Sequence, residues 1–206
     1  MSGNNVKILL DGIPLIDRGA TKQSLSQLDV NSIERVEIVE GPMSVVYGTD
    51  ALAGVINIIT KKGDGYSEEN TWRVGARVQE ESMGKEYDFF KDKGLHNESI
   101  DLGFNHKSGL FVNGGYTRNN HGGWQGDLTG REKRWHPKDQ ALMNGMFGFQ
   151  NRNMNVWYRL DFLDEKIFGP NNGSELQPEK VSDKDFLTKR YTHQLQSDWK
   201  LDNRLD

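Results

Sequence analysis

Six segments between residues 72 and 201 alternate apolar and polar side chains. Such alternation places the apolar side chains on one face of an extended strand and the polar ones on the other. The clearest case is residues 155–162, where Val156 and Tyr158 alternate with Asn155 and Arg159. The other five segments are residues 72–79, 100–105, 110–117, 143–149 and 190–201. The pattern predicts an antiparallel sheet with one apolar and one polar face.

The connections between these segments alternate in length. Short polar turns at residues 107–109 and 151–153 alternate with long polar stretches at residues 80–97, 119–140 and 164–189. Transmembrane β-barrels have this asymmetry, with short periplasmic turns and longer extracellular loops. Soluble β domains usually have loops of a few residues at both ends. The connections therefore favour barrel strands.

Aromatic side chains support the same interpretation. Trp72, Tyr116, Tyr191 and Trp199 fall near the predicted strand ends, where an interfacial aromatic girdle is expected. The chain has no run of about 18 consecutive apolar residues, so no transmembrane helix is predicted. Only 34% of its residues are hydrophobic, which barrel strands allow because half of each strand is polar.

Charge and cysteine content exclude other classes of function. The net charge of -4 gives no basic face, so nucleic-acid binding is not expected. The absence of cysteine rules out a disulfide framework and a thiolate site. We find no nucleophile elbow, phosphate-binding loop or zinc-protease pattern, so the chain is not expected to be an enzyme.

A different pattern occupies residues 33–62. Val36 and Ile38 alternate with Glu37, which predicts a half-buried strand. Gly41 and Pro42 then end this strand, because proline has no N–H to donate to a ladder. A helical turn is predicted over residues 43–47, closed by Gly48, and a β-branched strand over residues 55–60. Periodicity alone indicates a strand–turn–strand unit.

The particular residues of this unit resemble the signature at the end of the plug domain in TonB-dependent outer-membrane receptors. The matching residues are Glu34, Arg35, Val36, Glu37, Gly41, Pro42, Ser44, Tyr47, Gly48, Ala51, Gly54, Val55, Ile56, Asn57, Ile58, Ile59, Thr60 and Lys61. Two positions depart from the family pattern: Glu40 replaces a basic residue, and Ala53 replaces the first glycine of a pair. In the family, plug arginines face barrel glutamates. Arg35 can take such a role, whereas Glu40 cannot.

The resemblance implies a mainly β fold in two parts. Residues 1–63 would form the C-terminal part of a plug domain, with a strand at residues 6–10 and Ile13-Pro14-Leu15 leaving that strand. Residues 64–206 would form about six antiparallel strands of a transmembrane barrel that has roughly 22. Residues 1–5 resemble no signal peptide, and no TonB-contacting segment precedes the plug strands. An internal part of a longer receptor in the cell outer membrane is therefore expected.

The resemblance also implies a function and its partners. The receptor would import a scarce ligand such as a siderophore, haem or cobalamin, energised by the TonB–ExbB–ExbD complex through a segment outside this chain. Outer-membrane lipid would be a further partner, and no cofactor is expected. The candidate ligand-binding residues are Asp17, Arg18, Thr21, His121, Trp124 and His136. The candidate structural residues of the plug motif are Arg35, Glu37, Gly41, Pro42, Tyr47, Gly48, Gly54 and Asn57.

Two questions stay open at the level of sequence. The loop histidines could ligate haem iron or could be ordinary solvated side chains, so the presence of a metal is undetermined. A secreted or surface β-rich ligand-binding module is the alternative function, since it also accounts for the low hydrophobicity. It does not account for the pattern of residues 33–62.

Overall fold

The computed structural model describes residues 6–15, 27–42, 51–62, 69–128, 130–170 and 183–200. The chain divides into two compact units, residues 1–62 (unit 1) and residues 63–206 (unit 2). The described secondary structure is β-strand, apart from one turn of 3-10 helix at Val30–Ser32 (η3). Within the described ranges, no helix is long and apolar enough to cross a membrane.

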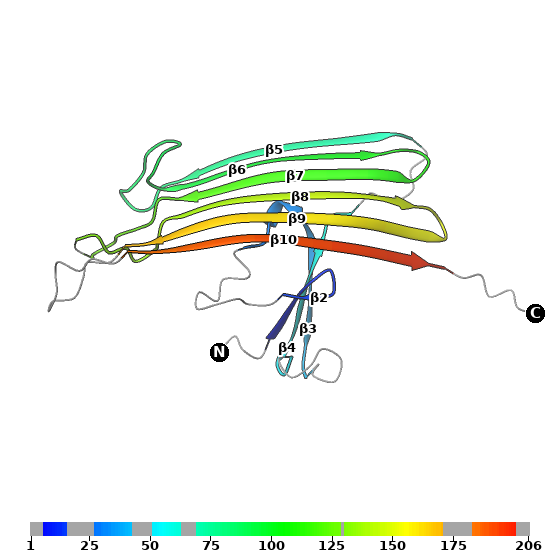
Figure 1. Ribbon diagram of the computed structural model, residues 1–206, viewed down its shortest axis with the longest axis horizontal. Coiled ribbons are helices and arrows are strands. Elements are labelled where there is room, and N and C mark those ends of the chain that lie inside the picture. The colour runs from blue at the N-terminus through cyan, green and yellow to red at the C-terminus, as the bar shows by residue number, and fades with distance from the viewer. Residues whose placement is uncertain are drawn as a thin grey trace, which may run out of the picture. The chain divides into compact units, whose positions relative to one another are not determined.

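Unit 1 is built on a small mixed sheet. Its strands are β1 (Val6–Leu10), β2 (Ile13–Pro14), β3 (Ile33–Glu40) and β4 (Gly54–Thr60), in the order β2-β1-β4-β3 (Figure 1). β1 and β4 run parallel, and β3 pairs with β4 antiparallel. Leu9, Ala51 and Val55 form the buried apolar cluster beside the two central strands. The β-branched residues that predicted β4 thus form a central strand of the sheet.

Two expectations for unit 1 need correction. Ile13 and Pro14 do not leave the first strand, because they turn back and pair antiparallel with Leu10 and Leu9. The alternation in β3 is present, but Val36 and Ile38 are 51% and 68% exposed. The expectation of a half-buried strand is therefore wrong, because β3 is an edge strand of the described sheet and its apolar side chains stay exposed. The helical turn predicted over residues 43–47 lies outside the described residues.

Unit 2 is a six-stranded antiparallel sheet. Its strands follow one another in chain order: β5 (Thr71–Glu81), β6 (Leu95–Asn105), β7 (Leu110–His121), β8 (Lys138–Gln150), β9 (Met154–Gly169) and β10 (Lys184–Trp199) (Figure 1). Every strand pairs with its sequence neighbour, which is the connectivity of a meander. The prediction of six antiparallel strands in a mainly β fold is confirmed.

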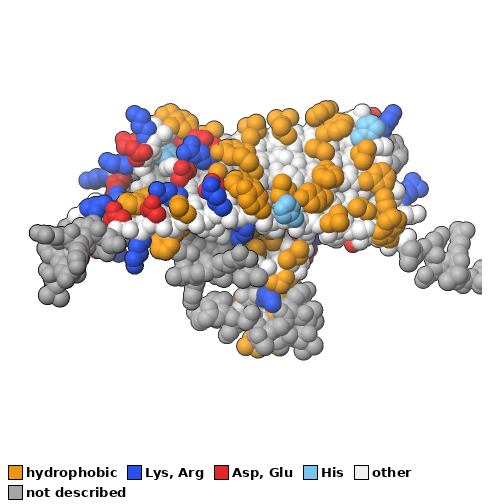
Figure 2. Space-filling view, in the orientation of Figure 1, with side chains coloured by type: hydrophobic (Ala, Val, Ile, Leu, Met, Phe, Trp, Pro, Cys, Tyr) orange, Lys and Arg blue, Asp and Glu red, His pale blue; other side chains and the backbone are white. Residues whose placement is uncertain are grey.

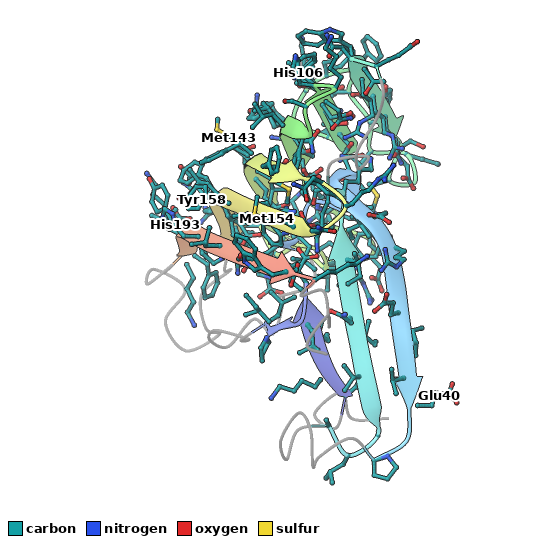
Figure 3. The ribbon with its side chains drawn as sticks, turned by 90° about the vertical axis from the view of Figure 1, so that its right-hand side faces the viewer. Glu40, His106, Met143, Met154, Tyr158 and His193 are labelled. Atoms are coloured by element: carbon teal, nitrogen blue, oxygen red, sulfur yellow. The ribbon has the colours of Figure 1, made fainter. Side chains whose placement is uncertain are left out.

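The two faces of this sheet differ in chemistry. The register places Leu102, Val112, Phe147 and Tyr158 on one face. The short turns between β6 and β7 and between β8 and β9 lie at one end of the sheet, called the short-turn end below. Figure 2 shows the apolar face, where hydrophobic side chains cover the middle of the sheet and its short-turn end. Seen from the short-turn end, Met143, Tyr158 and His193 project from the same side of the sheet (Figure 3). The alternation predicted from sequence therefore appears as a continuous apolar band.

The strands are longer than predicted, and the long connections are correspondingly shorter. β6 begins at Leu95, β7 ends at His121 and β8 begins at Lys138. The predicted boundaries were wrong because alternation of apolar and polar residues stops where the apolar band stops. Beyond that level charged and apolar residues mix on both faces, for example Asp164 and Leu187 on one and Leu163 on the other, yet the backbone ladder continues.

Because the strands are longer than predicted, two of the aromatic residues predicted at strand ends lie elsewhere along their strands. Tyr116 pairs with Met143, which pairs with Phe162, which in turn pairs with Tyr191. Tyr116 and Tyr191 therefore share one row across four strands and mark the edge of the apolar band rather than the ends of their strands. Trp72 and Trp199 do lie at strand ends, as predicted.

The polar face contains a small apolar core of its own. Phe111, Met146 and Trp157 are buried together there. Gly148 stands between Phe111 and Trp157 in the register, and a Cβ at that position would lie 2.6 Å from Phe111 Cζ. The missing side chain therefore creates the space that the two rings fill.

A ladder of amides crosses the polar face nearer the long loops. Asn97 donates to Asn119, and Asn119 Nδ2 donates to Gln140 Oε1 at 2.9 Å. Gln140 Nε2 then donates to Glu165 Oε2 at 2.8 Å, and both of these side chains are buried. Buried polar groups of this kind are stable only when they are paired, so this row fixes the register of four strands.

Candidate functional site

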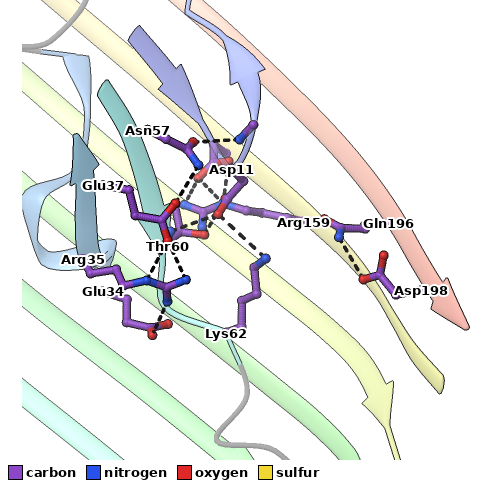
Figure 4. Close-up of polar contacts among 12 residues, drawn as sticks. Asp11, Glu34, Arg35, Glu37, Asn57, Thr60, Lys62, Arg159, Gln196 and Asp198 are labelled. Carbon is purple, nitrogen blue, oxygen red and sulfur yellow. Dashed lines mark hydrogen bonds and ion pairs between the residues drawn. The ribbon is translucent and has the colours of Figure 1, made fainter. Parts of the chain in front are cut away.

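The plug motif is organised around a buried carboxylate. Asp11, at the turn after β1, accepts hydrogen bonds from Thr60 N at 3.0 Å and Thr60 Oγ1 at 2.6 Å (Figure 4). Its side chain is fully buried, and Lys62 Nζ lies 3.9 Å from Oδ1. Asp11 also has a φ of 49°, in the left-handed region. Aspartate tolerates this region better than most residues, so both its backbone and its side chain suit the turn.

A second chain of polar contacts joins the other residues of the motif. Gly12 N donates to Asn57 Oδ1 at 3.0 Å, and Asn57 Nδ2 donates to Glu37 Oε2 at 3.2 Å. Glu37 Oε1 in turn accepts from Arg35 Nε at 3.0 Å. Asn57 thereby connects the turn after β1 to the edge strand β3. This network explains why an amide and a carboxylate occur at these two positions of the motif.

Arg35 is paired within unit 1. Its guanidinium contacts Glu34 at 2.8 Å and Glu37 at 2.9 Å. The hydrogen bond to Glu37 is the largest cause of the raised pKa of Arg35, and Glu34 acts in the same direction. These pairs are partly exposed, so they position the side chain more than they stabilise the unit.

The glycines of the motif are required for different physical reasons. Gly54 has a φ of 145°, and a Cβ there would lie 2.5 Å from Val39 O. Gly41 has a φ of 106° with open space around it, and Pro42 follows it after the end of β3. Gly54 is therefore needed for space as well as for backbone conformation, and Gly41 for conformation alone. Tyr47 and Gly48 lie outside the described residues.

The candidate ligand residues of unit 2 gather in the connection between β7 and β8. Trp124 N donates to Trp135 O at 2.9 Å, and Trp135 N donates back to Trp124 O at 3.1 Å. Their rings lie 5.5 Å apart, and the ring of His121 lies 6.0 Å from that of Trp135. The loop is thus a closed hairpin with an aromatic cluster at its base. Trp135, which precedes the candidate residue His136, thus joins Trp124 and His121 in this cluster.

The two histidines have different surroundings. His121 Nδ1 donates to the backbone carbonyl of His136 at 3.4 Å. His121 Nε2 is buried and has no hydrogen-bond partner within the described residues. The side chain of His136 is exposed, and its ring lies close to Gly169. The structure therefore brings His121, Trp124 and the backbone of His136 together.

This loop is also tied to the connection between β5 and β6. Gly122 N donates to Gly94 O at 3.1 Å, and Gln125 N donates to Glu86 Oε1 at 3.4 Å. Lys133 Nζ lies 3.9 Å from Glu86 Oε2. Loops joined in this way hold their aromatic side chains in a defined position, which lowers the entropic cost of binding a ligand.

A cavity of about 290 Å³ opens beside this cluster. It is lined by Asp92, Asn120, His121, Gly122, Pro137, Lys138, Asp139, Lys166 and Phe168. Sequence reasoning identified only His121 among these residues. The others belong to three different strands and two loops, so no local pattern connects them.

At its far end the loop carries an exposed ion pair. Arg134 Nε donates to Asp127 Oδ1 at 2.6 Å, and this hydrogen bond is the main cause of the lowered pKa of Asp127. Across the described ranges, no group of three or more metal-ligating side chains is close enough to hold a metal ion. Asp17, Arg18 and Thr21 lie outside the described residues.

Comparison with known proteins agrees with the plug-like network of unit 1. Residues 1–55 match the family described as TonB-dependent Receptor Plug Domain. A stretch of 75 residues is 41% identical to the vitamin B12 transporter BtuB of Vibrio vulnificus (strain CMCP6). That stretch is 36% of this chain and 12% of the transporter.

Solved structures extend the similarity to both units. A variant of the ferric enterobactin receptor PfeA from Pseudomonas aeruginosa superposes with a TM-score of 0.66 at 17% identity. The match covers 97% of this chain and 31% of that receptor. The siderophore receptor PirA from Acinetobacter baumannii gives a TM-score of 0.56 at 21% identity, over 85% of this chain and 26% of the receptor. At such low identity these matches show the fold alone.

Plug family, strand topology and fold all lead to one assignment. The plug family covers residues 1–55, and the receptor fold covers nearly all of the chain, which spans less than a third of each of these relatives. Residues 1–55 therefore belong to the plug-domain family of TonB-dependent receptors, and nearly the whole chain has the fold of these outer-membrane receptors.

Proposed function

We propose that the receptor containing this chain imports a scarce small ligand, such as a siderophore, haem or cobalamin, across the outer membrane. The match of residues 1–55 to the plug family is the observation that carries the proposal. The alternative of a secreted or surface binding module is not favoured, because it leaves that match without an explanation. The relatives described above are named as a transporter and as receptors, which supports a function without chemical conversion of the ligand.

Each unit has a role in this proposal. Residues 1–63 form the C-terminal part of the plug, and residues 64–206 form the first strands of the barrel wall. The apolar face of unit 2 faces lipid, and its polar face lines the interior. The TonB–ExbB–ExbD complex supplies the energy, and no bond of the ligand is broken.

The loops that connect the long strands bind the ligand first. Aromatic side chains on a hairpin that is fixed by backbone pairing offer a large contact area at low entropic cost. Trp124, together with Trp135, would contact the apolar or planar part of a ligand. His121 and His136 would contribute polar contacts, and Asp17, Arg18 and Thr21 would do so from the plug.

Uptake by cells tests the proposal directly. The intact receptor is produced in a strain that lacks its own cobalamin and siderophore receptors, and uptake of radiolabelled cyanocobalamin, ferric enterobactin and haem is measured. We expect uptake of one ligand class, with binding but no uptake after deletion of TonB or addition of an uncoupler. Uptake that continues without TonB, or an absence of binding to all three classes, would contradict the proposal.

A further inference from the structure

The apolar face of unit 2 contains a cavity of about 410 Å³ near the short-turn end. Its lining includes Phe104, His106, Leu110, Val112 and Phe147, which come from β6, β7, β8 and the turn after β6. The volume falls in the range of small-molecule sites, roughly 300–1,000 Å³. Among the described residues that line it, His106 alone has a polar side chain, so the cavity suits a hydrocarbon group.

Two aromatic side chains form the walls of this cavity. Phe104 on β6 and Phe147 on β8 flank Val112 of β7 in one cross-strand row. The ring of Phe104 lies 4.3 Å from that of Trp72, and the ring of Phe147 lies 5.4 Å from that of Tyr158. Each wall is thus supported by a second ring, which fixes its position. Val112 and Phe147 remain 56% and 58% exposed, so much of the lining is not covered by the protein itself.

The open space continues from the cavity toward the middle of the sheet. Gly114, two residues beyond Val112 on the same face, is the cross-strand partner of Gly145. A Cβ at Gly145 would meet nothing within 4 Å, and Figure 2 shows gaps between the hydrophobic side chains of this face. The cavity and this gap together form a groove along β7 from Leu110 to Tyr116, called the β7 groove below. Its length is roughly 20 Å at a rise of about 3.3 Å per residue.

A hydrogen-bond donor lies at the short-turn end of the groove. His106 directly follows β6 there, and its Nδ1 accepts a hydrogen bond from Ser108 N at 3.2 Å (Figure 3). Ser108 Oγ lies 2.8 Å from the same nitrogen. Because Nδ1 accepts from an N–H, the hydrogen of the neutral ring is on Nε2. Nε2 has no hydrogen-bond partner among the described residues, so it can donate to a ligand.

The place of the groove in the barrel indicates its occupant. In transmembrane barrels the short turns lie on the periplasmic side, the apolar band faces lipid, and the strands tilt by about 35–45°. A groove of roughly 20 Å along a tilted strand therefore covers a depth of about 15 Å. The hydrocarbon core is about 30 Å thick, so the chains of one leaflet extend about as far.

We propose that the β7 groove binds one long acyl chain of an ester-linked lipid of the periplasmic leaflet. The chain lies between Phe104 and Phe147, over Val112, and extends to the two glycines. Lipid chains are as apolar as the face itself, so hydrophobicity alone does not retain one of them. The groove retains the chain by packing, because a chain inside it contacts protein on three sides rather than one. The ester carbonyl accepts a hydrogen bond from His106 Nε2.

The test uses the intact receptor, purified in detergent. The probes are dipalmitoyl phosphatidylethanolamine, its diether analogue, which lacks the ester carbonyls, and the dihexanoyl ester with the same headgroup. Dipalmitoyl phosphatidylglycerol is the control for the headgroup. Native mass spectrometry gives the number of lipids bound and the apparent Kd of each probe.

Five variants examine the parts of the groove. Val112→Phe fills the cavity, and Gly145→Leu fills the space beyond it. Val74→Phe is the matched control, since Val74 lies on the same face, is 71% exposed and does not line the cavity. His106→Phe keeps a ring but removes the donor, whereas His106→Gln keeps a donor. A circular dichroism spectrum equal to that of the parent confirms that each variant is folded.

We expect the parent receptor to retain one dipalmitoyl lipid, with either headgroup, and not the dihexanoyl ester. Val112→Phe and Gly145→Leu should each weaken this binding at least about fivefold, because both remove many packing contacts of the chain. Val74→Phe should have no effect. The diether probe and His106→Phe should each weaken binding about two- to fivefold, since one hydrogen bond is lost, and His106→Gln should keep most of it.

Other results would contradict the proposal. Equal retention of the dihexanoyl ester would show that no long chain is recognised, and a preference that follows the headgroup would assign the binding to polar contacts. Weakening by Val74→Phe as large as that by Val112→Phe would assign it to the apolar face as a whole. Equal binding of the ester and ether probes would exclude the role of His106. The proposal rests on the placement of unit 2 in the outer membrane, and none of these outcomes bears on ligand uptake.

Discussion

Thr60 donates two hydrogen bonds to the carboxylate of Asp11, one from its backbone N–H at 3.0 Å and one from its hydroxyl at 2.6 Å. Asp11 lies in the turn after β1, and Thr60 is the last residue of β4. The pair closes the end of the parallel β1–β4 ladder, next to the backbone hydrogen bond that Asp11 N donates to Ile58 O at 2.9 Å. Both side chains are buried, so their contact with each other replaces contact with water.

Replacing Asp11 should weaken unit 1. Asp11→Ala leaves the Thr60 donors unsatisfied in a buried position and is expected to cost about 1–3 kcal/mol of local stability. Asp11→Asn keeps one acceptor and tolerates the left-handed backbone, so its cost should be smaller. Hydrogen exchange of residues 54–62 in the intact receptor measures both effects. Unchanged protection in Asp11→Ala would show that the pair is not needed.

Two glycines of β8 form a matched pair for a test of packing. A Cβ at Gly148 would lie 2.6 Å from Phe111 Cζ and 2.7 Å from Trp157 Cβ, whereas a Cβ at Gly145 would meet nothing within 4 Å. Gly148→Ala should therefore destabilise the barrel by about 1–3 kcal/mol through overpacking. Gly145→Ala should be neutral or slightly stabilising. Urea unfolding of the receptor in lipid vesicles measures the difference, and equal effects at both positions would disprove the packing argument.

The aromatic cluster of the β7–β8 loop should matter for ligand capture. Trp124→Ala removes one ring of the Trp124–Trp135 pair and leaves the backbone pairing in place. Since buried aromatic contacts often contribute more than about 1 kcal/mol to binding, affinity should fall at least about fivefold. Titration of the intact receptor with the ligand found in the uptake assay measures the change. Trp72→Ala, at the short-turn end of the apolar face, is the control and should leave the affinity unchanged.

Tyr87, in the loop after β5, should ionise at a higher pH than an ordinary tyrosine. Desolvation raises the pKa of its phenol, and the hydrogen bond to Glu80 at 3.2 Å raises it further. The folded state thus holds the phenol proton more tightly than the unfolded chain does. The resulting stabilisation is complete below the ordinary tyrosine pKa of about 10 and is lost as the pH rises through the higher folded pKa.

Absorbance titration at alkaline pH can resolve this phenol. The difference between the parent receptor and Tyr87→Phe gives the titration of Tyr87 alone. Glu80→Gln should move this titration toward lower pH, because the neutral amide no longer disfavours the phenolate. A Tyr87 titration at the ordinary tyrosine pH in the parent receptor would show that the loop does not hold the Glu80 contact in solution.

Several features of the fold could be predicted from local patterns. Alternation identified all six strands of unit 2, because the side chains of a strand in lipid must differ between its two faces. The plug motif at residues 33–62 identified β3, β4 and the family. The strand ends were predicted less well, since β6, β7 and β8 continue past the apolar band, where the strict alternation of apolar and polar residues is lost.

The candidate site was predictable only in part. Trp124 and His121 were found from their place in a long loop, and the structure brings both to one aromatic cluster. Lys138, Lys166 and Asp92 were not found, because they reach the same cavity from different strands and loops. The sequence around any one of these residues contains no pattern that indicates that the other two lie beside it.

The sequence by itself determined the family, the strand count and the two chemically different faces of unit 2, since these follow from the period of the side chains and from short-range motifs. Only the tertiary structure decided which residues are neighbours across strands. The register aligned Tyr116 with Tyr191 in one row across four strands and left space beside Gly148 for two rings. Backbone hydrogen bonds alone are nearly indifferent to a shift of register, and the fit of side chains across the whole sheet fixes it.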